Sequence, residues 1–290
     1  RDRRAAGACV ASPIGNRYSV SSKRGVSVVA SHTEVSRDGG PVVGYGCNSN
    51  GRYAQQGLLR DRFIPRLRDA TAEMIVDETG ENLDPFRIWE ILMQNEKPGG
   101  HGERSVAVGV LDMAVWDIVA KIEARPLAQV LAERFGDGST DARVAVYAAG
   151  GYYYPDDDLE RLREEMRGYL TLGYTATKMK IGGVPLADDL RRIDAALEVI
   201  EKPECLAVDA NGRFDEATTL AYARGMEHYG LRWFEEAGDP LDYEIQKALG
   251  KAYSGATATG ENLFSHQDVR NLMRYAGMRA DRDILQMDPV

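Results

Sequence analysis

From residue 142 onward, the sequence alternates short apolar runs with amphipathic runs of helical period. The expected strands are 144–149, 176–181, 205–211, 231–236, 256–262 and 284–290. The expected helices between them are about 157–170, 186–200, 215–228, 242–250 and 266–275. Strands that are apolar throughout, each followed by a helix, are typical of a parallel sheet that is covered by helices. This alternation predicts an α/β fold for the second half of the chain.

The spacing of three acidic residues favours a closed barrel over an open sheet. Asp209, Glu235 and Glu261 each stand near the C-terminal end of an expected strand, and 26 residues separate each from the next. A (β/α)₈ barrel gathers such residues around one mouth, whereas an open sheet spreads them along an edge. No Gly-x-Gly-x-x-Gly follows a strand, so nothing favours the dinucleotide-binding open sheet. We therefore predict a (β/α) barrel over residues 141–290.

Residues 1–140 have a mixed pattern that predicts a separate α+β domain. Two short β-prone runs, 25–31 and 41–46, surround a hairpin turn at 36–40. A helical pattern covers about 58–93 and is interrupted near Pro85. A Gly- and Pro-rich loop at 95–102 then leads into a nearly all-apolar helix at 105–122, which we expect to be buried.

The expected barrel is incomplete in this sequence. Six strands are predicted, whereas a closed barrel of this type has eight. An incomplete barrel exposes two unpaired strand edges, which proteins normally avoid. The sequence also does not begin with Met. We expect it to be a portion of a longer protein or a truncated gene product.

The composition narrows the classes of partner and compartment. The 290 residues carry a net charge of −9, which argues against nucleic acid or an anionic membrane surface as the main partner. No apolar run approaches the roughly 18 residues that span a bilayer. Three scattered cysteines are typical of reduced thiols, so we expect a cytoplasmic protein.

The three strand-end acids form a candidate Mg²⁺ site. Mg²⁺ is a hard ion that prefers oxygen ligands, and three carboxylates on successive strands can take one face of its octahedron. A single such acid is more often a helix cap or a solvated strand end, but caps need no regular spacing. Glu236 follows Glu235 directly, and strand alternation sends the two side chains to opposite faces. The equal spacing favours Glu235 as the ligand.

Two lysines end the strand before the first of these acids. Alternation in Lys178-Met179-Lys180 turns both lysines inward and Met179 toward the helices. Alone, this pattern would be an ordinary surface pair on an edge strand. Beside a metal, two neighbouring ammonium groups disfavour each other's protonation, which lowers a lysine pKa toward that of a general base. We therefore predict that Lys180, with Lys178 beside it, removes a proton next to a substrate carboxylate, while Mg²⁺ stabilises the resulting enediolate.

Four strand-end motifs resemble those of the enolase superfamily, mandelate racemase branch. They are Lys178-Met179-Lys180, Val208-Asp209-Ala210-Asn211, Trp233-Phe234-Glu235-Glu236 and Thr259-Gly260-Glu261-Asn262. The apolar helix is similar too, through its Asp112-Met113-Ala114-Val115-Trp116-Asp117 segment. The resemblance implies an N-terminal α+β capping domain, here 1–140, and an enolase-type barrel. It also implies a small-molecule hydroxy-acid substrate and a homo-oligomer.

Three further segments resemble the D-tartrate dehydratases. They are the runs 95–105, 147–155 and 261–266. This resemblance implies a hydro-lyase that converts D-tartrate to oxaloacetate and water, with Lys180 taking the C2 proton. It also implies a His that protonates the leaving hydroxyl and an Asp that holds this His. Asp288 matches that Asp, and the His is expected beyond residue 290.

Substrate contacts are expected from several loops. Asn50 and Arg52 belong to a loop that resembles the family's closing loop, and Lys97 and His101 belong to the tartrate-like loop. The distal carboxylate needs a positive partner, for which Lys97 is the first choice. Tyr147 and Asn211 complete the expected contacts at the barrel mouth. An exposed loop side chain without a binding role is an equally good interpretation of the loop residues.

Two other functions fit the same sequence. One is another acid-sugar dehydratase or an epimerase of the superfamily, and an epimerase needs bases on both faces of its substrate. The other is an inactive, truncated protein that only binds Mg²⁺. Turnover of tartrate isomers distinguishes these alternatives.

Overall fold

The computed structural model describes the chain except for residues 1–7, 17–18, 25, 49–53, 100–101 and 289–290. The described chain divides into two compact units, one made mainly of residues 23–144 and the other mainly of 145–288. Near the N-terminus, β1 (Ala8–Asn16) and β2 (Ser19–Arg24) form a two-stranded sheet that the sequence did not predict.

An antiparallel hairpin packed on one long helix forms the centre of the first unit. The strands β3 (Val28–Arg37) and β4 (Gly40–Cys47) confirm the predicted hairpin, with Asp38 and Gly39 both at positive φ in the turn. The helix α5 (Glu103–Ile122) confirms the predicted buried helix. A Cβ added at Gly44 or Gly46 would lie 2.0 Å from a carbonyl oxygen of α5, so glycine is needed for this close approach.

The remaining helices of the first unit are short: the pattern predicted over about 58–93 is divided into several helices, and the helix at 127–135 was not predicted. They are α1 (Gln55–Leu58), a π-helical turn (Leu59–Phe63), α2 (Ile64–Asp69), α3 (Ala72–Ile75), α4 (Pro85–Met93) and α6 (Leu127–Phe135). The break near Pro85 is confirmed, because Asp84 caps α4 by accepting bonds from the amides of Phe86 and Arg87. The apolar core of this unit includes Phe63, Leu92, Val110 and Leu111.

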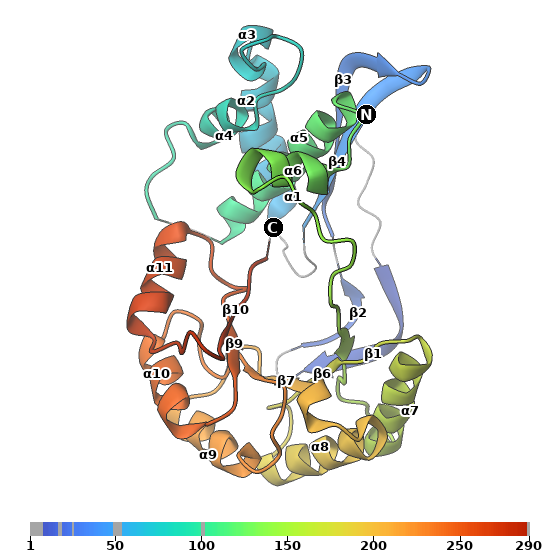
Figure 1. Ribbon diagram of the computed structural model, residues 1–290, viewed down its shortest axis with the longest axis vertical. Coiled ribbons are helices and arrows are strands. Elements are labelled where there is room, and N and C mark those ends of the chain that lie inside the picture. Colours follow the sequence, from blue (N-terminus) through green and yellow to red (C-terminus); the bar gives the residue numbers. More distant parts are fainter. Residues whose placement is uncertain (1–7, 17–18, 25, 49–53, 100–101, 289–290) are drawn as a thin grey trace. The chain divides into compact units, whose positions relative to one another are not determined.

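A parallel sheet of six strands in sequence order organises the second unit (Figure 1). The strands are β5 (Ala148–Gly150), β6 (Thr177–Lys180), β7 (Leu206–Asp209), β8 (Phe234–Glu235), β9 (Thr257–Thr259) and β10 (Ile284–Leu285). The intervening helices are α7 (Asp158–Thr171), α8 (Leu186–Ile200), α9 (Glu216–Met226), α10 (Tyr243–Ala252) and α11 (His266–Tyr275). A short 3₁₀ turn, Pro203–Cys205, precedes β7. The predicted α/β fold is thus confirmed.

The strands are buried on both faces, which explains their apolar sequences. Met179, Val208 and Phe234 pack into the core under the helices. On the opposite face, Ala207, Trp233 and Ala258 form a smaller cluster with Tyr147. This alternation leaves Lys178, Lys180, Asp209 and Glu235 on the inner face, as predicted.

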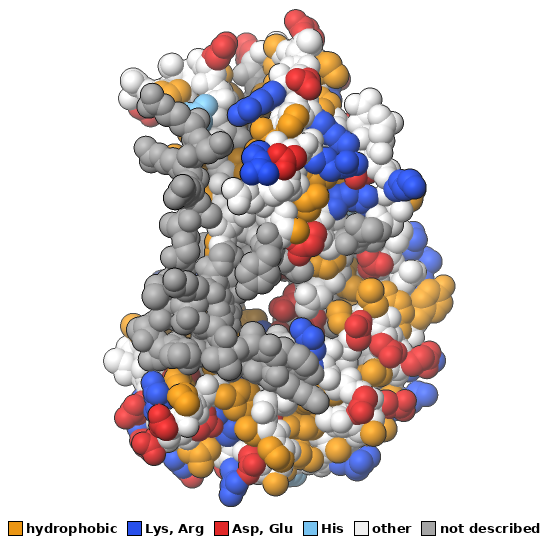
Figure 2. Space-filling view, turned by 180° about the vertical axis from the view of Figure 1, so that it is seen from behind, with side chains coloured by type: hydrophobic (Ala, Val, Ile, Leu, Met, Phe, Trp, Pro, Cys, Tyr) orange, Lys and Arg blue, Asp and Glu red, His pale blue; other side chains and the backbone are white. Residues whose placement is uncertain are grey.

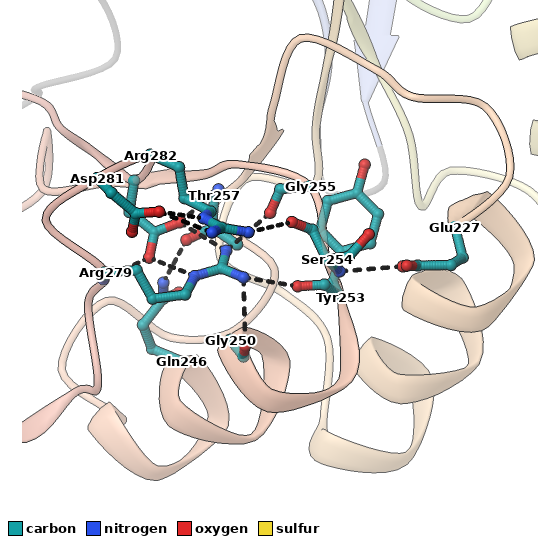
Figure 3. A network of polar contacts seen from close by, with 11 residues as sticks. Glu227, Gln246, Gly250, Tyr253, Ser254, Gly255, Thr257, Arg279, Asp281 and Arg282 are labelled. Atoms are coloured by element: carbon teal, nitrogen blue, oxygen red, sulfur yellow. Dashed lines mark hydrogen bonds and ion pairs between the residues drawn. The ribbon is translucent and has the colours of Figure 1, made fainter.

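A polar clamp around Arg279 fastens the loops at the N-terminal ends of β9 and β10 (Figure 3). The Arg279 guanidinium donates to the carbonyls of Tyr253, Gly250 and Gly255 and pairs with Asp283 at 2.7 Å. Asp283 in turn accepts the amide of Thr257, the first residue of β9. The clamp ties α10, β9 and β10 together.

Charges of both signs are interspersed on the face of the molecule shown in Figure 2. No helix in the described part of the chain is long and apolar enough to cross a membrane.

Candidate active site at the strand ends

Two lysines and two acids meet at the C-terminal ends of three neighbouring strands. The register aligns Lys180 with Asp209 and Asp209 with Glu235. Lys180 Nζ lies 2.6 Å from Asp209 Oδ2, and Lys178 Nζ lies 3.2 Å from the same oxygen. Lys178 Nζ also donates to Glu235 Oε1. The lysines are nearly buried and the acids fully so, so these charges are paired with one another instead of with water.

Neighbouring groups fix the two acids in place. Trp233 Nε1 donates to Glu235 Oε2 at 2.8 Å, and the backbone amide of Asn211 donates to Asp209 Oδ1 at 2.8 Å. Asn211 has a φ of 53°, a conformation rare for residues other than glycine. Residues in such rare backbone conformations cluster at functional sites, where the surrounding structure holds them in place.

The pKa values follow this pairing. Burial works to raise the pKa of Asp209, but Lys180 and Lys178 outweigh burial and lower it. Burial and the charge of Asp209 raise the pKa of Glu235, although Lys178 and Trp233 partly oppose them. Burial works to lower the pKa of Lys178, yet Asp209 and Glu235 raise it overall. The expected lowering of a lysine pKa is therefore wrong for Lys178, because two carboxylates lie within 3.2 Å of its ammonium group.

Glu236 is held away from the lysines by a separate partner. Both of its oxygens accept from Asn262 Nδ2, at 2.8 and 2.9 Å. Its φ of 40° departs from strand geometry, and burial raises its pKa to about 8. Glu235, not Glu236, contacts the lysine pair in this structure.

Two further acids, Glu261 and Asp288, follow β9 and β10 of the same sheet. Glu261 follows β9 and is partly buried, and burial raises its pKa while Lys178 and Lys180 act to lower it. The charge of Asp288, an exposed residue after β10, also acts on Glu261. Glu261 is thus within electrostatic reach of the inner group, and Asp288 is within electrostatic reach of Glu261.

The donor chemistry of this region fits Mg²⁺, although the ligating arrangement is not formed. Among the described residues, no group of three or more His, Cys, Asp or Glu side chains is placed to hold a metal ion. Instead, the Lys178 ammonium group bridges Asp209 and Glu235. A cationic group between two carboxylates shows that this position favours positive charge. The oxygen donors of Asp209, Glu235 and Glu261 are the kind that Mg²⁺ prefers.

The expected substrate contacts have different outcomes. Tyr147 lies beside Lys178, with Nζ 5.7 Å from its ring centroid, and packs edge-on against Trp233. Asn211 borders Asp209, as described above. Lys97 is exposed in the first unit, where its carbonyl accepts from Arg104. Asn50, Arg52 and His101 lie outside the described residues.

Three aromatic or charged neighbours of the site were not predicted from the sequence. Tyr152 lies with its ring centroid 5.7 Å from Lys180 Nζ. Asp189 and Arg192 of α8 hold the loops on either side of Lys180. The available signal was an Asp and an Arg three residues apart on an otherwise apolar helix face.

Residues 161–290 match the family model described as enolase C-terminal domain-like. An arabinonate dehydratase of Saccharolobus solfataricus is 27% identical over 91% of this chain and 65% of its own length. An L-talarate/galactarate dehydratase of Salmonella typhimurium is 28% identical over 82% of this chain and 56% of its own length. These matches support the predicted relation to the enolase superfamily.

Solved structures agree on the fold. A racemase from Streptomyces coelicolor with bound magnesium superposes with a TM-score of 0.75 at 24% identity, over 94% of this chain and 71% of that one. A variant L-talarate/galactarate dehydratase liganded with Mg and L-glucarate superposes with a TM-score of 0.74 at 25% identity, over 93% of this chain and 65% of that one. The chain spans 56–65% of the length of the two curated relatives described above.

Proposed function

We propose, on the premise that residues 161–290 form an enolase-like C-terminal domain, that the protein is a Mg²⁺-dependent hydro-lyase of hydroxy acids. The observation that carries this proposal is the paired group of Lys178, Lys180, Asp209 and Glu235 at three adjacent strand ends. The dehydratases that resemble this chain in sequence support the same class of reaction by their names.

The lysine pair supplies the proton-transfer group. Lys180 removes the proton α to the substrate carboxylate, and the electron pair moves into the enediolate that forms. The C–O bond of the neighbouring hydroxyl then breaks, the hydroxyl leaves as water after gaining a proton, and the enol becomes a 2-keto acid. Lys178 holds positive charge beside the developing oxyanion. Asp288 is proposed to orient the acid that protonates the leaving hydroxyl.

Asp209, Glu235 and Glu261 are the residues that would hold Mg²⁺. When bound, the ion supplies charge stabilisation for the substrate carboxylate as its α-proton is removed. Binding requires Lys178 to leave its bridge between Asp209 and Glu235, since both carboxylates are needed as ligands. Displacement of one cation by another keeps these buried carboxylates neutralised.

We propose D-tartrate as the substrate, on the resemblance of the loops at 95–105 and 147–155 to the D-tartrate dehydratases. Asn50, Arg52, Lys97 and His101, from a capping domain over 1–140, are proposed to bind it, together with Tyr147 and Asn211 of the barrel over 141–290. We further propose a cytoplasmic homo-oligomer. The second candidate is a dehydratase of a longer acid sugar, which the talarate/galactarate and gluconate relatives favour.

The test follows formation of a 2-keto acid. Purified full-length protein is incubated with Mg²⁺ and, separately, with D-, L- and meso-tartrate, galactarate, L-talarate, arabinonate and D-gluconate. Turnover of D-tartrate that EDTA abolishes is the expected result. Turnover of only a longer acid sugar would move the assignment to the second candidate, and turnover of none would leave the inactive Mg²⁺-binding protein as the better description.

The Lys180→Met variant tests the base. We expect exchange of the substrate α-proton with D₂O, followed by ¹H NMR, to fall by about 10²- to 10⁴-fold, as for loss of a general base. The exposed Lys202→Met variant is the control and should exchange at the wild-type rate. Undiminished exchange in Lys180→Met would contradict the assigned role.

A further inference from the structure

One turn of α8 carries two buried charged residues that are not part of the lysine and carboxylate group. Asp189 is 0% exposed and Arg192 is 2% exposed. Burial of charge is costly unless it is paired and hydrogen-bonded, so both need specific partners. Their partners lie in the two loops on either side of Lys180.

Asp189 holds the turn that follows β6. Its Oδ2 accepts from the amide of Gly182 and from the Tyr222 hydroxyl, each at 2.6 Å. Its Oδ1 accepts from the Tyr153 hydroxyl at 2.7 Å, and that hydroxyl in turn accepts from the amide of Gly183. A single carboxylate thereby fixes the two residues that begin this turn.

Arg192 holds the loop that follows β5. Its NH2 group donates to the carbonyl of Gly151 at 2.8 Å and to that of Tyr152 at 3.3 Å. Its NH1 group pairs with Asp158, and its guanidinium stacks on the Tyr153 ring at 4.0 Å. The guanidinium thus fixes the backbone on both sides of the Tyr152 Cα.

The Gly151 carbonyl links this loop directly to the lysine strand. It also accepts from the backbone amide of Lys180 at 3.2 Å, so Arg192 and Lys180 share one acceptor. A Cβ at Gly151 would lie 2.4 Å from the Met179 Cβ, which shows how closely the loop lies against β6. The Tyr152 ring then reaches Lys180 Nζ, with 5.7 Å between Nζ and the ring centroid.

We propose that Asp189 and Arg192 are positioning residues, which hold the loops after β5 and β6 so that the Tyr152 ring confines the Lys180 ammonium group against Asp209. Lys180 Nζ contacts Asp209 Oδ2 through its charge and Tyr152 through a cation–π interaction. These contacts restrict the directions in which Nζ can approach a substrate. The inference deepens the proposed function, since it concerns the orientation of the proposed base.

Competitive labelling of lysines with trace acetic anhydride tests this without any substrate. The acetylation of Lys180 is measured by peptide mass spectrometry at fixed pH, relative to the exposed Lys202. In Tyr152→Leu, which loses the ring, we expect Lys180 acetylation to rise by about 2- to 30-fold, the range that one cation–π contact supplies. In Tyr152→Phe, which keeps the ring, we expect the wild-type rate.

The Arg192→Met variant tests whether Arg192 acts on Lys180 through Tyr152. We expect it to raise Lys180 acetylation as Tyr152→Leu does, and the double variant to show no further rise, because both changes remove one contact. Arg191→Met is the matched control, since Arg191 is the preceding residue of α8 and its side chain is 70% exposed. Additive effects, or an equal rise in the control, would overturn the proposal. If Arg192→Met fails to fold, Arg192→Lys replaces it, because Lys keeps the charge but lacks the two NH2 groups of the guanidinium. An unchanged rate of Lys180 acetylation in Arg192→Lys would also overturn the proposal.

This result is separable from the proposed function. Persistent α-proton exchange in Lys180→Met would remove the catalytic role of Lys180 and leave the labelling pattern intact. An unchanged labelling pattern in the loop variants would remove the positioning role while exchange still depended on Lys180.

Discussion

At the end of β8, two consecutive glutamates occupy different surroundings. Glu235 pairs with Lys178, whereas Glu236 binds Asn262 and has its pKa raised by burial to about 8. The difference follows from the φ of 40° at Glu236, which turns this residue out of the strand path. Their roles should therefore differ even though their sequence positions are adjacent.

We predict that Glu235→Gln lowers Mg²⁺ affinity by at least about tenfold, because it removes a charged oxygen ligand. Glu236→Gln is the matched control and should bind Mg²⁺ with affinity close to wild type, since the Gln amide resembles the protonated acid. Isothermal titration with Mg²⁺ measures both. A larger loss of Mg²⁺ affinity in Glu236→Gln than in Glu235→Gln would mean that Glu236, and not Glu235, is the ligand.

At the scale of single elements, the clamp around Arg279 joins α10, β9 and β10 through partly buried contacts. Arg279 bonds three carbonyls and pairs with Asp283, whose side chain is 1% exposed. Burial works to raise the pKa of Asp283, but bonds from Arg279 and from backbone amides lower it overall. A lowered carboxyl pKa contributes stability that is present above the unfolded-state pKa and is lost as pH falls through the folded-state pKa.

We predict that Arg279→Met lowers the free energy of unfolding by about 3–5 kcal/mol at neutral pH, because Asp283 then remains buried and unpaired. Arg282→Met is the control and should leave the free energy of unfolding close to that of wild type, because Arg282 is exposed and pairs with Asp281 at the surface. Urea unfolding at pH 7 measures both. The difference between Arg279→Met and wild type should shrink as pH falls below about 4, where Asp283 becomes neutral in the unfolded chain. A constant difference down to pH 3 would show that the charge of Asp283 is not involved.

The helix α5 contains a carboxyl group that gives the opposite pH dependence. Burial raises the pKa of Asp112 to about 6. A raised carboxyl pKa contributes stability below the unfolded-state pKa, and this stability is lost as pH rises through the folded-state value. Ionised Asp112 therefore destabilises the folded state at neutral pH.

We predict that Asp112→Asn raises the free energy of unfolding by about 1–3 kcal/mol at pH 7.5, with the gain falling away at pH 4.5. Thermal unfolding at the two pH values gives the comparison. An equal effect at both pH values would mean that packing, and not charge, distinguishes the two side chains.

At the scale of the whole molecule, an exposed connection separates the two units. Residues 136–146 are all exposed, and the units divide between 144 and 145. We propose this connection as the boundary between the capping domain and the barrel. The sequence placed the boundary at 140, from the change of pattern at Ala142.

We predict that brief trypsin treatment cleaves first after Arg143, because exposed connections between compact units are preferred sites of proteolysis. Intact-mass spectrometry then detects fragments that begin at Val144. Arg143→Gln should abolish these fragments without changing the unfolding temperature, because trypsin does not cleave after Gln. Earlier cleavage within 148–288 would argue against a compact second unit.

The sequence by itself determined the order of elements in the second unit and the inner face of its strands. Mainly apolar strands, each followed by a helix, leave a parallel sheet as the arrangement that buries them. Alternation then places the charged residues Lys178, Lys180, Asp209 and Glu235 together on the inner face. Strand ends were less well predicted, because hydrogen bonding to a neighbouring strand, and not local preference, decides where each strand stops.

Only the tertiary structure decided which charges pair. The two lysines were expected to act on each other, yet each pairs with a carboxylate, Lys178 with Asp209 and Glu235 and Lys180 with Asp209. At such short separations the attraction between opposite charges is strong. The positions of Tyr152, Asp189 and Arg192 around Lys180 were likewise decided there, because they depend on contacts between residues up to 41 positions apart in the chain. Local sequence pattern carries no information on such contacts, and they determine how the proposed base is held.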